Sequence, residues 1–212
     1  MISANKSGAA HSDKKQKGRL IVFEGIDGTG KSTQLHRLSK TLRSRGIDVV
    51  TSFEPTNGRH GAILRKSATS KRLSVENELQ LFQRDRREHV KSLITPSLER
   101  GSWVLLDRYY FSNMAYQGAR GVDPLKIRAV NEAFAPRPDL LLLFELDPKI
   151  AIERIGVRDG QGNEFETFRG LEACSRIFAG LNDSFITRIN ATKTPDRVAK
   201  KILTTVDESN WI

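Results

Sequence analysis

The sequence predicts an α/β fold in which a five-stranded parallel sheet carries helices on both faces. Short apolar runs of strand length alternate along the chain with longer segments of helical periodicity. Two of the runs, 19–24 and 140–146, are apolar almost throughout, which is typical of strands buried on both faces. A chain of 212 residues with 38% hydrophobic side chains can form one such domain around its own core.

The strands are expected where an apolar run is closed by glycine, proline or a charged residue. They are residues 19–24, 47–53, 103–107, 140–146 and 185–191. Helices are expected between them, at 30–45, at 75–100 with an interruption at Pro96, from 123 to about 134, from 147 and from 194. The first helix carries Leu35, Leu38 and Leu42 at helical spacing and ends before Gly46, a common residue just beyond a helix.

Three helices are expected to begin with a cap residue followed by proline. Asp123, Asp147 and Thr194 each precede a proline, which suits the first helical position. The segment Gly156–Gly170 is rich in glycine and charged residues and separates two helical segments. A loop of that length in a compact domain is usually functional or mobile.

The charge and the single cysteine narrow the class of protein. The chain carries 35 basic against 25 acidic residues, a net charge of +10, which suits nucleic acid or nucleotide phosphates as partners. No apolar run approaches the ~20 residues of a membrane span. The lone Cys174 cannot form an internal disulfide, so a reducing, cytoplasmic location is expected.

Residues 1–18 are expected to be a disordered basic tail in front of one domain at 19–212. The tail contains lysines but no apolar run that would make a secretory signal. An arm that touches nucleic acid and a transit segment are the alternatives.

Residues Gly25–Ser32 match the phosphate-loop pattern G-x-x-x-x-G-K-[ST] and stand between the first predicted strand and helix. Glycines let backbone N–H groups turn toward a phosphate, and the helix N-terminus adds its dipole. This context predicts a fold of the P-loop NTPase type. Lys31 is expected to face the β- and γ-phosphates of ATP. The predicted ATP-binding residues are Gly25, Ile26, Asp27, Gly28, Thr29, Gly30, Lys31, Ser32 and Thr33.

Asp107 ends a buried strand and Arg108 follows it, at the edge where ligands bind in open α/β sheets. Ser32 and Asp107 are expected to hold Mg²⁺, and Arg108 is expected to point into the same crevice. The alternatives are a turn-capping role for Asp107 and a structural ion pair with Asp107 for Arg108.

Among P-loop proteins, the residues favour a nucleoside monophosphate kinase. A GTPase should carry N-K-x-D, but in 192–196 the aspartate stands one position too late. A kinase of alcohols needs a general base, whereas a monophosphate acceptor is already an anion with a second pKa of about 6. Such an enzyme mainly needs positive charge around two nucleotides. Arginines near predicted strand or loop ends supply it: Arg65, Arg86, Arg108, Arg154 and Arg158.

Four motifs, in order and spacing, resemble the thymidylate kinase family from about Arg19 to the C-terminus. They are F-E-G-I-D-G-T-G-K-S-T-Q at 23–34, E-P-T at 54–56 (R-E-P in the family), L-F-Q-R-D-R at 81–86 (L-F-x-A-x-R) and D-R-Y-Y-F-S-N-M-A-Y-Q-G at 107–118 (D-R-Y-x-x-S-x-x-A-Y-Q-G). The resemblance implies transfer of the ATP γ-phosphate to dTMP, giving dTDP for dTTP synthesis, with Mg²⁺ and as a homodimer.

The resemblance also implies roles for individual residues. Phe82 would stack on thymine, Arg86 would donate to its O4, and Asn113 would lie against the base. Arg108 would hold the dTMP phosphate, and Tyr116 would lie under the sugar at C2′. The implied substrate-binding residues are Glu54, Phe82, Arg86, Arg108, Asn113, Tyr116 and Gln117. From the residues alone, Phe82 also suits a helix core, Arg86 a solvated face, and Tyr109 and Tyr116 general packing.

Two positions bear on catalysis. Phe53 stands where the family usually has arginine, so Arg59 or Arg65 could take over that contact. The resemblance also implies a mobile lid at about residues 154–170. The family draws an extra cation from the phosphate loop or from this lid, and Thr29 in the loop is not basic. Arg154 and Arg158 are then the candidates, and Arg158 is preferred because Arg154 could simply brace its helix. The implied catalytic residues are Asp27, which would order the acceptor 3′-hydroxyl or an Mg²⁺ water, with Lys31, Arg108 and Arg158.

Two competing functions remain at the level of sequence. A monophosphate kinase of other or broader base specificity is one, because a methyl group in an apolar pocket is worth only about 1–3 kcal/mol. A nucleotide-dependent nucleic-acid-binding protein is the other, suggested by the basic composition. The arginines gather around the predicted crevice of the sheet, which favours the kinase.

Overall fold

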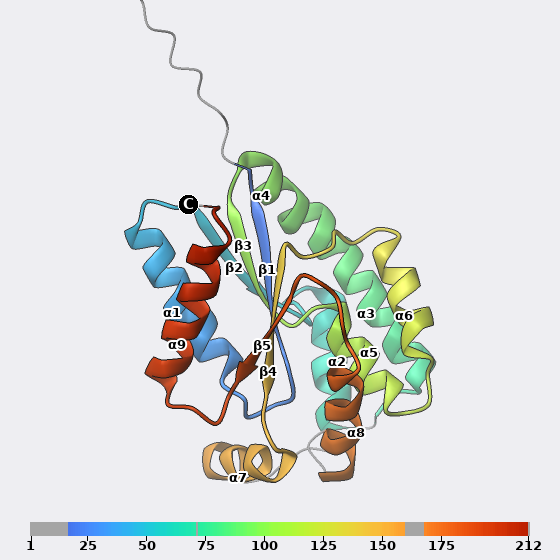
Figure 1. Cartoon of the computed structure of the whole chain (residues 1–212). Coiled ribbons are helices and arrows are strands. Elements are labelled where there is room, and N and C mark those ends of the chain that lie inside the picture. The colour runs from blue at the N-terminus through green and yellow to red at the C-terminus, as the bar shows by residue number, and fades with distance from the viewer. Residues whose placement is uncertain (1–16, 71, 160–167, 212) are drawn as a thin grey trace, which may run out of the picture.

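A computed structural model of the chain describes residues 17–70, 72–159 and 168–211, with the backbone alone for 157–159 (Figure 1). Its centre is a parallel sheet in the order β2-β3-β1-β4-β5. The strands are β1 (Arg19–Glu24), β2 (Val49–Phe53), β3 (Trp103–Asp107), β4 (Leu140–Glu145) and β5 (Ile186–Asn190). The predicted α/β fold with five parallel strands is confirmed. Residues 1–16 of the expected tail and 160–167 of the expected lid lie outside the described residues.

Helices cover both faces of the sheet. On one side lie α1 (Lys31–Ser44) and α9 (Pro195–Glu208), at the left in Figure 1. On the other side lie α3 (Val75–His89), α4 (Thr95–Arg100), α5 (Tyr110–Gly118) and α6 (Pro124–Glu132), with α2 (Arg59–Thr69) against α3 and α8 (Phe168–Ala179) against α5. Helix α7 (Pro148–Asp159) follows β4 and crosses the carboxyl end of the sheet, at the bottom of the view.

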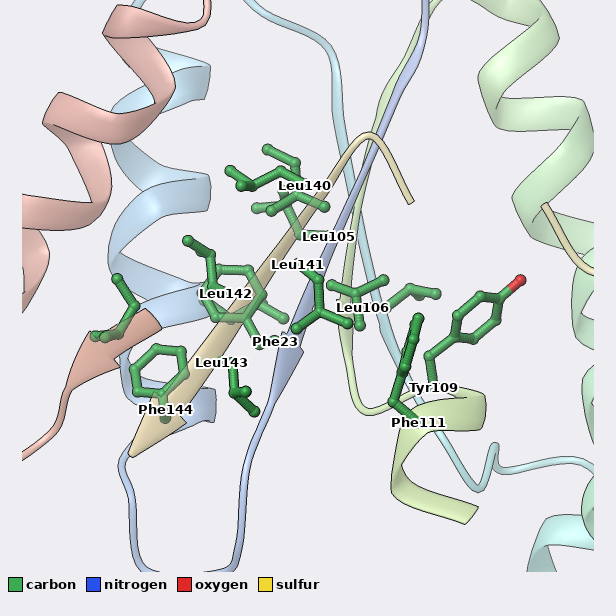
Figure 2. Close-up of a cluster of buried hydrophobic side chains, with 14 of the residues drawn as sticks. Phe23, Leu105, Leu106, Tyr109, Phe111, Leu140, Leu141, Leu142, Leu143 and Phe144 are labelled. Atoms are coloured by element: carbon green, nitrogen blue, oxygen red, sulfur yellow. The ribbon is translucent and has the colours of Figure 1, made fainter. Parts of the chain in front are cut away.

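The hydrophobic core lies on both sides of β4. Leu142 and Phe144 point toward α1 and α9, whereas Leu141 and Leu143 point the other way, toward the start of α5 (Figure 2). On the first side the ring of Phe144 stacks on Phe23 of β1, with centroids 6.0 Å apart. Burial of both faces explains why this strand is apolar at nearly every position.

The helical stretch 75–100 is interrupted, but not at the expected place. Helix α3 continues into a π-helical segment, η1 (Val90–Ile94), and α4 begins directly after it with Pro96 in its first turn. Pro96 has no N–H to donate to the preceding turn, so the irregularity falls before the proline. The prediction of an interruption at Pro96 itself was therefore wrong by about one turn.

Two helices were not predicted. Seven of the nine residues of α5 are buried, so it has no alternation of polar and apolar faces that a sequence pattern could display. In α2, Gly61 lowers the helical propensity. This glycine is needed because a Cβ there would lie 1.9 Å from the carbonyl oxygen of Thr56.

Two of the three expected helix caps form. Asp123 accepts from the N–H of Leu125 at 2.9 Å, and Asp147 accepts from the N–H of Lys149 at 2.8 Å. Helix α9 begins at Pro195 as expected, but the side chain of Thr194 makes no capping hydrogen bond, which corrects that prediction. None of the helices in the described part of the chain has the length and hydrophobicity needed to cross a bilayer.

Candidate active site

The phosphate loop joins β1 to α1 at the carboxyl end of the sheet, and its glycines adopt backbone angles that other residues avoid. Gly25, Gly28 and Gly30 have φ of +136°, +78° and +88°. At Gly28 a Cβ would lie 2.6 Å from the carbonyl oxygen of Ala151 in α7. The glycines therefore allow both the turn of the loop and the close approach of a neighbouring helix.

Lys31 opens α1 and folds back over the loop. Its Nζ donates to the carbonyl oxygen of Ile26 at 2.9 Å and lies 3.4 Å from Oγ1 of Thr29. Burial, together with the positive charge of Arg108, lowers the pKa of Lys31 to about 8, although Asp27 and Asp107 act in the opposite direction. The ammonium group thus lies at the loop, where a bound phosphate would stabilise its charge.

A groove of about 760 Å³ runs along the loop, and its lining comes from the loop, the start of α1, the ends of β2 and β3, and Arg154 of α7. In it the hydroxyl of Ser32 donates to Oδ2 of Asp107. Two hard oxygen atoms in direct contact beside a phosphate loop suit Mg²⁺, which takes one or two protein oxygens and completes its shell with water and phosphate. The two residues predicted to hold the metal are thus in direct contact.

Arg108 lies between the groove and a second cavity. Its Nη2 donates to Oδ1 of Asp27 and lies 3.4 Å from the hydroxyl of Tyr116, and its Nη1 donates to Oγ of Ser112 at 3.0 Å. Its ion pair is therefore with Asp27, not with Asp107 as the alternative interpretation had it. Burial would raise the pKa of Asp27, but Arg108, Lys31 and Tyr116 outweigh burial and lower it to about 2.

The second cavity, of about 280 Å³, adjoins the groove and shares Asp27, Glu54 and Arg108 with it. Its walls come from α2, α3 and α5. It brings together every residue predicted to bind the acceptor: Glu54, Phe82, Arg86, Arg108, Asn113, Tyr116 and Gln117. Tyr116 packs against the hydrophobic core, as the packing interpretation expected, and it also lines this cavity and donates its hydroxyl to Oδ2 of Asp27 at 3.0 Å.

Arg86 is buried at the end of this cavity, with 1% of its surface exposed. Its Nε donates to Glu54 at 2.8 Å, its Nη1 to Asn131 at 2.6 Å and its Nη2 to Asn113 at 2.7 Å. The alternative that Arg86 lies on a solvated helix face is wrong. Phe82, one turn earlier, is partly exposed and lines the cavity instead of joining the core. Tyr109, by contrast, is fully buried, as the packing interpretation expected.

Sequence reasoning missed three buried polar residues of α3 that support the cavity, Glu78, Asp85 and His89. Oε2 of Glu78 accepts from Nε2 of Gln117 at 3.3 Å. Asp85 accepts from the N–H and the hydroxyl of Thr56, both at 2.7 Å, and from the N–H of Gly61 at 3.0 Å. His89 contacts Glu54 through Nδ1 at 3.0 Å and Ser52 through Nε2 at 2.8 Å. Phe82, Asp85, Arg86 and His89 share one helix face at spacings of three and four, which was the available signal.

The two arginines that could replace the one expected at position 53, Arg59 and Arg65, lie in different places. Phe53 lies at the groove with 44% of its surface exposed. Arg65 lines the acceptor cavity and donates through Nη1 to the carbonyl oxygens of Pro55 at 2.8 Å and Thr56 at 2.6 Å. Arg59 lines neither the groove nor the cavity as the described residues form them.

Of the two candidates for the lid cation, the structure describes the side chain of Arg154. Arg154 lines the groove, and its Nη1 donates to the carbonyl oxygen of Ala191 at 3.1 Å and lies 3.4 Å from that of Gly28. It therefore braces the phosphate loop and the turn after β5, not only its own helix. Arg158 lies in the last turn of α7, but its side chain is outside the described residues.

Comparisons with known proteins identify the family of the chain. A family model described as thymidylate kinase matches residues 23–202. The thymidylate kinase of Akkermansia muciniphila is 56% identical over 188 residues, which cover 89% of this chain and 91% of that protein. The thymidylate kinase of Desulfotalea psychrophila is 46% identical over 193 residues, which cover 90% and 95%. That of Xanthomonas oryzae pv. oryzae is 52% identical over 167 residues, which cover 79% and 73%. The chain therefore belongs to the thymidylate kinase family.

Proposed function

We propose that the chain transfers the γ-phosphoryl group of ATP to dTMP and forms dTDP. One observation carries the proposal beyond family membership. Asp27 and Arg108 line both the groove along the phosphate loop and the adjoining cavity, so ligands in the two would meet at one guanidinium. An arginine between two phosphates can hold both in line and stabilise the charge that develops during transfer.

On the donor side, backbone N–H groups of the loop and Lys31 would hold the ATP phosphates. Ser32 and Asp107 would hold Mg²⁺, which supplies charge neutralisation at the β- and γ-phosphate oxygens when bound. Arg108 is the protein cation that faces the γ-phosphate from the acceptor side. Lys31 and Arg108 thus approach the phosphates from two elements, α1 and the end of β3.

On the acceptor side, the cavity suits a deoxynucleotide. Phe82 would lie against the base, while Glu54 and two asparagines hold Arg86 with its guanidinium toward the base. Tyr116, held by Asp27, would lie under the sugar at C2′. Arg65 lines the same cavity and would replace the arginine absent at Phe53.

The ionisation of Asp27 favours a phosphate over an alcohol as the attacking group. A carboxylate with a pKa of about 2 that is bonded to Arg108 and Tyr116 is a weak base for a hydroxyl group. A monophosphate needs no base, because its second pKa is about 6. Asp27 is then free to accept a hydrogen bond from the 3′-hydroxyl or from a water on Mg²⁺.

A coupled assay over a panel of monophosphates tests the proposal. We expect kcat/KM for dTMP to exceed that for dUMP by about 10–200-fold, the usual worth of one methyl group in an apolar pocket. Equal activity with dUMP or dCMP would instead indicate the broader kinase. Salt-sensitive DNA or RNA binding that stimulates ATP hydrolysis, without transfer to dTMP, would indicate the nucleic-acid-binding alternative.

Lys31 makes ATP binding sensitive to pH. In the free protein its pKa of about 8 means that it loses its proton as the pH rises through that value. Bound phosphates favour the charged ammonium and raise this pKa. When ATP binds at about pH 8.5, Lys31 should therefore take up a proton from the solvent. Calorimetry in two buffers of different ionisation enthalpy measures the uptake, with Lys31→Met as the control that lacks it. Equal heats in both buffers for the wild-type protein would contradict the assignment.

We also propose that the enzyme is a homodimer and works in the cytoplasm. Family resemblance supports the dimer, and so do exposed apolar side chains on α6, where Leu125 and Val130 are 71% and 41% exposed. The cytoplasmic location rests on the single, buried Cys174. Light scattering on the full chain would test the oligomeric state, and a monomeric mass at micromolar concentration would refute the dimer.

A further inference from the structure

Glu24, the last residue of β1, is a fully buried carboxylate with no part in the roles described above. Its exposed fraction is 0%. Oε1 accepts from the N–H of Tyr109 at 2.7 Å and of Ser112 at 3.0 Å, and Oε2 accepts from the hydroxyl of Ser112 at 2.7 Å. All three donors belong to the start of α5, and Tyr109 at the N-cap provides no side-chain cap of its own. Glu24 therefore caps α5 from a neighbouring strand.

Arg108 stands directly before this cap, in a backbone conformation that needs support. Its φ is +71°, in the left-handed region that costs a non-glycine residue about 1–2 kcal/mol. Two adjacent residues of β1 hold the backbone on either side of it. The N–H of Arg108 donates to the carbonyl oxygen of Phe23 at 3.0 Å, and the next N–H, that of Tyr109, donates to Glu24.

The side chain of Arg108 is tied to the same carboxylate through one hydroxyl group. Nη1 of Arg108 donates to Oγ of Ser112, which in turn donates to Oε2 of Glu24. Glu24 thus constrains Arg108 through the backbone and through the guanidinium. Because Glu24 directly precedes the phosphate loop, this chain of contacts links the strand that leads to the donor site with the helix that lines the acceptor cavity.

We propose that Glu24 is a positioning residue that holds the guanidinium of Arg108 toward the acceptor phosphate. The inference rests on the proposed function, in which Arg108 contacts that phosphate. A carboxylate suits the task because all three groups that reach it are donors, and an ionised carboxylate is acceptor-only. Burying this carboxylate disfavours its charged form: burial raises the pKa of Glu24 even though Arg108, Ser112 and Tyr109 oppose the shift.

A glutamine at this position would keep the shape and one accepting oxygen but would place an N–H group among donors. Glu24→Gln and Ser112→Ala therefore weaken the link at the carboxylate and at the bridging hydroxyl. Asp139→Asn is the matched control, because Asp139 accepts from the N–H of Leu20 at 2.9 Å and from Arg19 at 3.0 Å, at the opposite end of β1. It removes a comparable strand-end carboxylate away from the site.

The test compares the affinities for dTMP and thymidine by calorimetry, because their ratio isolates the phosphate contact. We expect Glu24→Gln to lower the preference for dTMP by about tenfold and Ser112→Ala to lower it by a smaller factor, with thymidine affinity within about twofold of wild type. Asp139→Asn should leave the ratio unchanged even where it lowers Tm. In an Arg108→Ala background, Glu24→Gln should change the ratio no further.

The contrary outcomes are distinct. An unchanged ratio in both Glu24→Gln and Ser112→Ala overturns the inference, and so does an equal loss of affinity for dTMP and thymidine, which indicates a helix cap alone. If Glu24→Gln does not fold, Ser112→Ala decides, because it leaves β1 intact. If the wild-type protein neither prefers dTMP to thymidine nor phosphorylates dTMP, the proposed function fails, and the inference fails with it.

Discussion

Arg108→Ala is expected to lower kcat for phosphoryl transfer to dTMP by about 10³-fold or more, the usual effect of removing an arginine that stabilises transferring phosphoryl charge. The reason is its place: its guanidinium lies at the junction of the phosphate groove and the acceptor cavity, held by Asp27 and Ser112. Negative charge shifts between the two phosphates at that point during transfer. The contact strengthens in the transition state, so kcat should fall more than nucleotide affinity does.

Arg108→Lys is the matched comparison, because it keeps the charge and loses the fork of donors. Lysine has its donors on a single nitrogen and cannot reproduce the contacts that Arg108 makes from separate nitrogens to Asp27 and Ser112, so most of the loss should persist. Steady-state kinetics with each substrate varied, together with ATP affinity by calorimetry, separate catalysis from binding. A kcat within tenfold of wild type for Arg108→Ala would exclude it as the central cation of the reaction.

Arg158→Ala is expected to lower kcat at least about a hundredfold while ATP affinity stays near normal. Lys31 is the one basic residue of the phosphate loop, residues 25–32, so we expect an arginine of the expected lid to meet the developing charge. Such a contact forms mainly in the transition state and therefore changes turnover rather than ground-state binding.

Arg154→Ala is the control for the lid assignment, because its contacts differ. Arg154 donates to the carbonyl oxygen of Ala191 and approaches that of Gly28, so its loss should loosen the phosphate loop and raise KM for ATP. If Arg154→Ala instead lowers kcat and Arg158→Ala raises KM for ATP, Arg154 is the lid cation. If kcat of Arg158→Ala is within a fewfold of wild type and Arg154→Ala does not show the large loss of kcat either, Arg169 is the remaining candidate.

The apolar strands and the phosphate loop could be predicted because each has a local pattern. Leu140–Phe144 is apolar since both faces of β4 are covered, and glycines mark the loop wherever φ is positive. Helix α5 could not be predicted from periodicity, because it is buried nearly all round. Its motif, by contrast, was visible through resemblance, so Asn113 and Tyr116 could be named as candidate site residues although the helix was not predicted.

Buried polar residues were the main omission at the site. Glu24, Asp85 and His89 look like ordinary surface residues in the sequence, because their partners come from distant segments and appear only when the chain is folded. Arg86 shows the same difficulty, since within R-D-R-R at 84–87 its burial cannot be told from the exposure of Arg87. Composition and spacing indicate which residues are polar, but packing decides which of them are enclosed.

The close approach of Gly28 to α7 has a mechanical consequence. A Cβ at this position would collide with the backbone of Ala151, which is itself fully buried, so loop and helix touch without clearance. Neither can shift toward the other, and an outward tilt of α7 would open a gap under the loop and pull on the hydrogen bonds of Arg154. A change in the angle of α7 would therefore act on the phosphate loop through direct backbone contact, with no flexible side chain between them to absorb it.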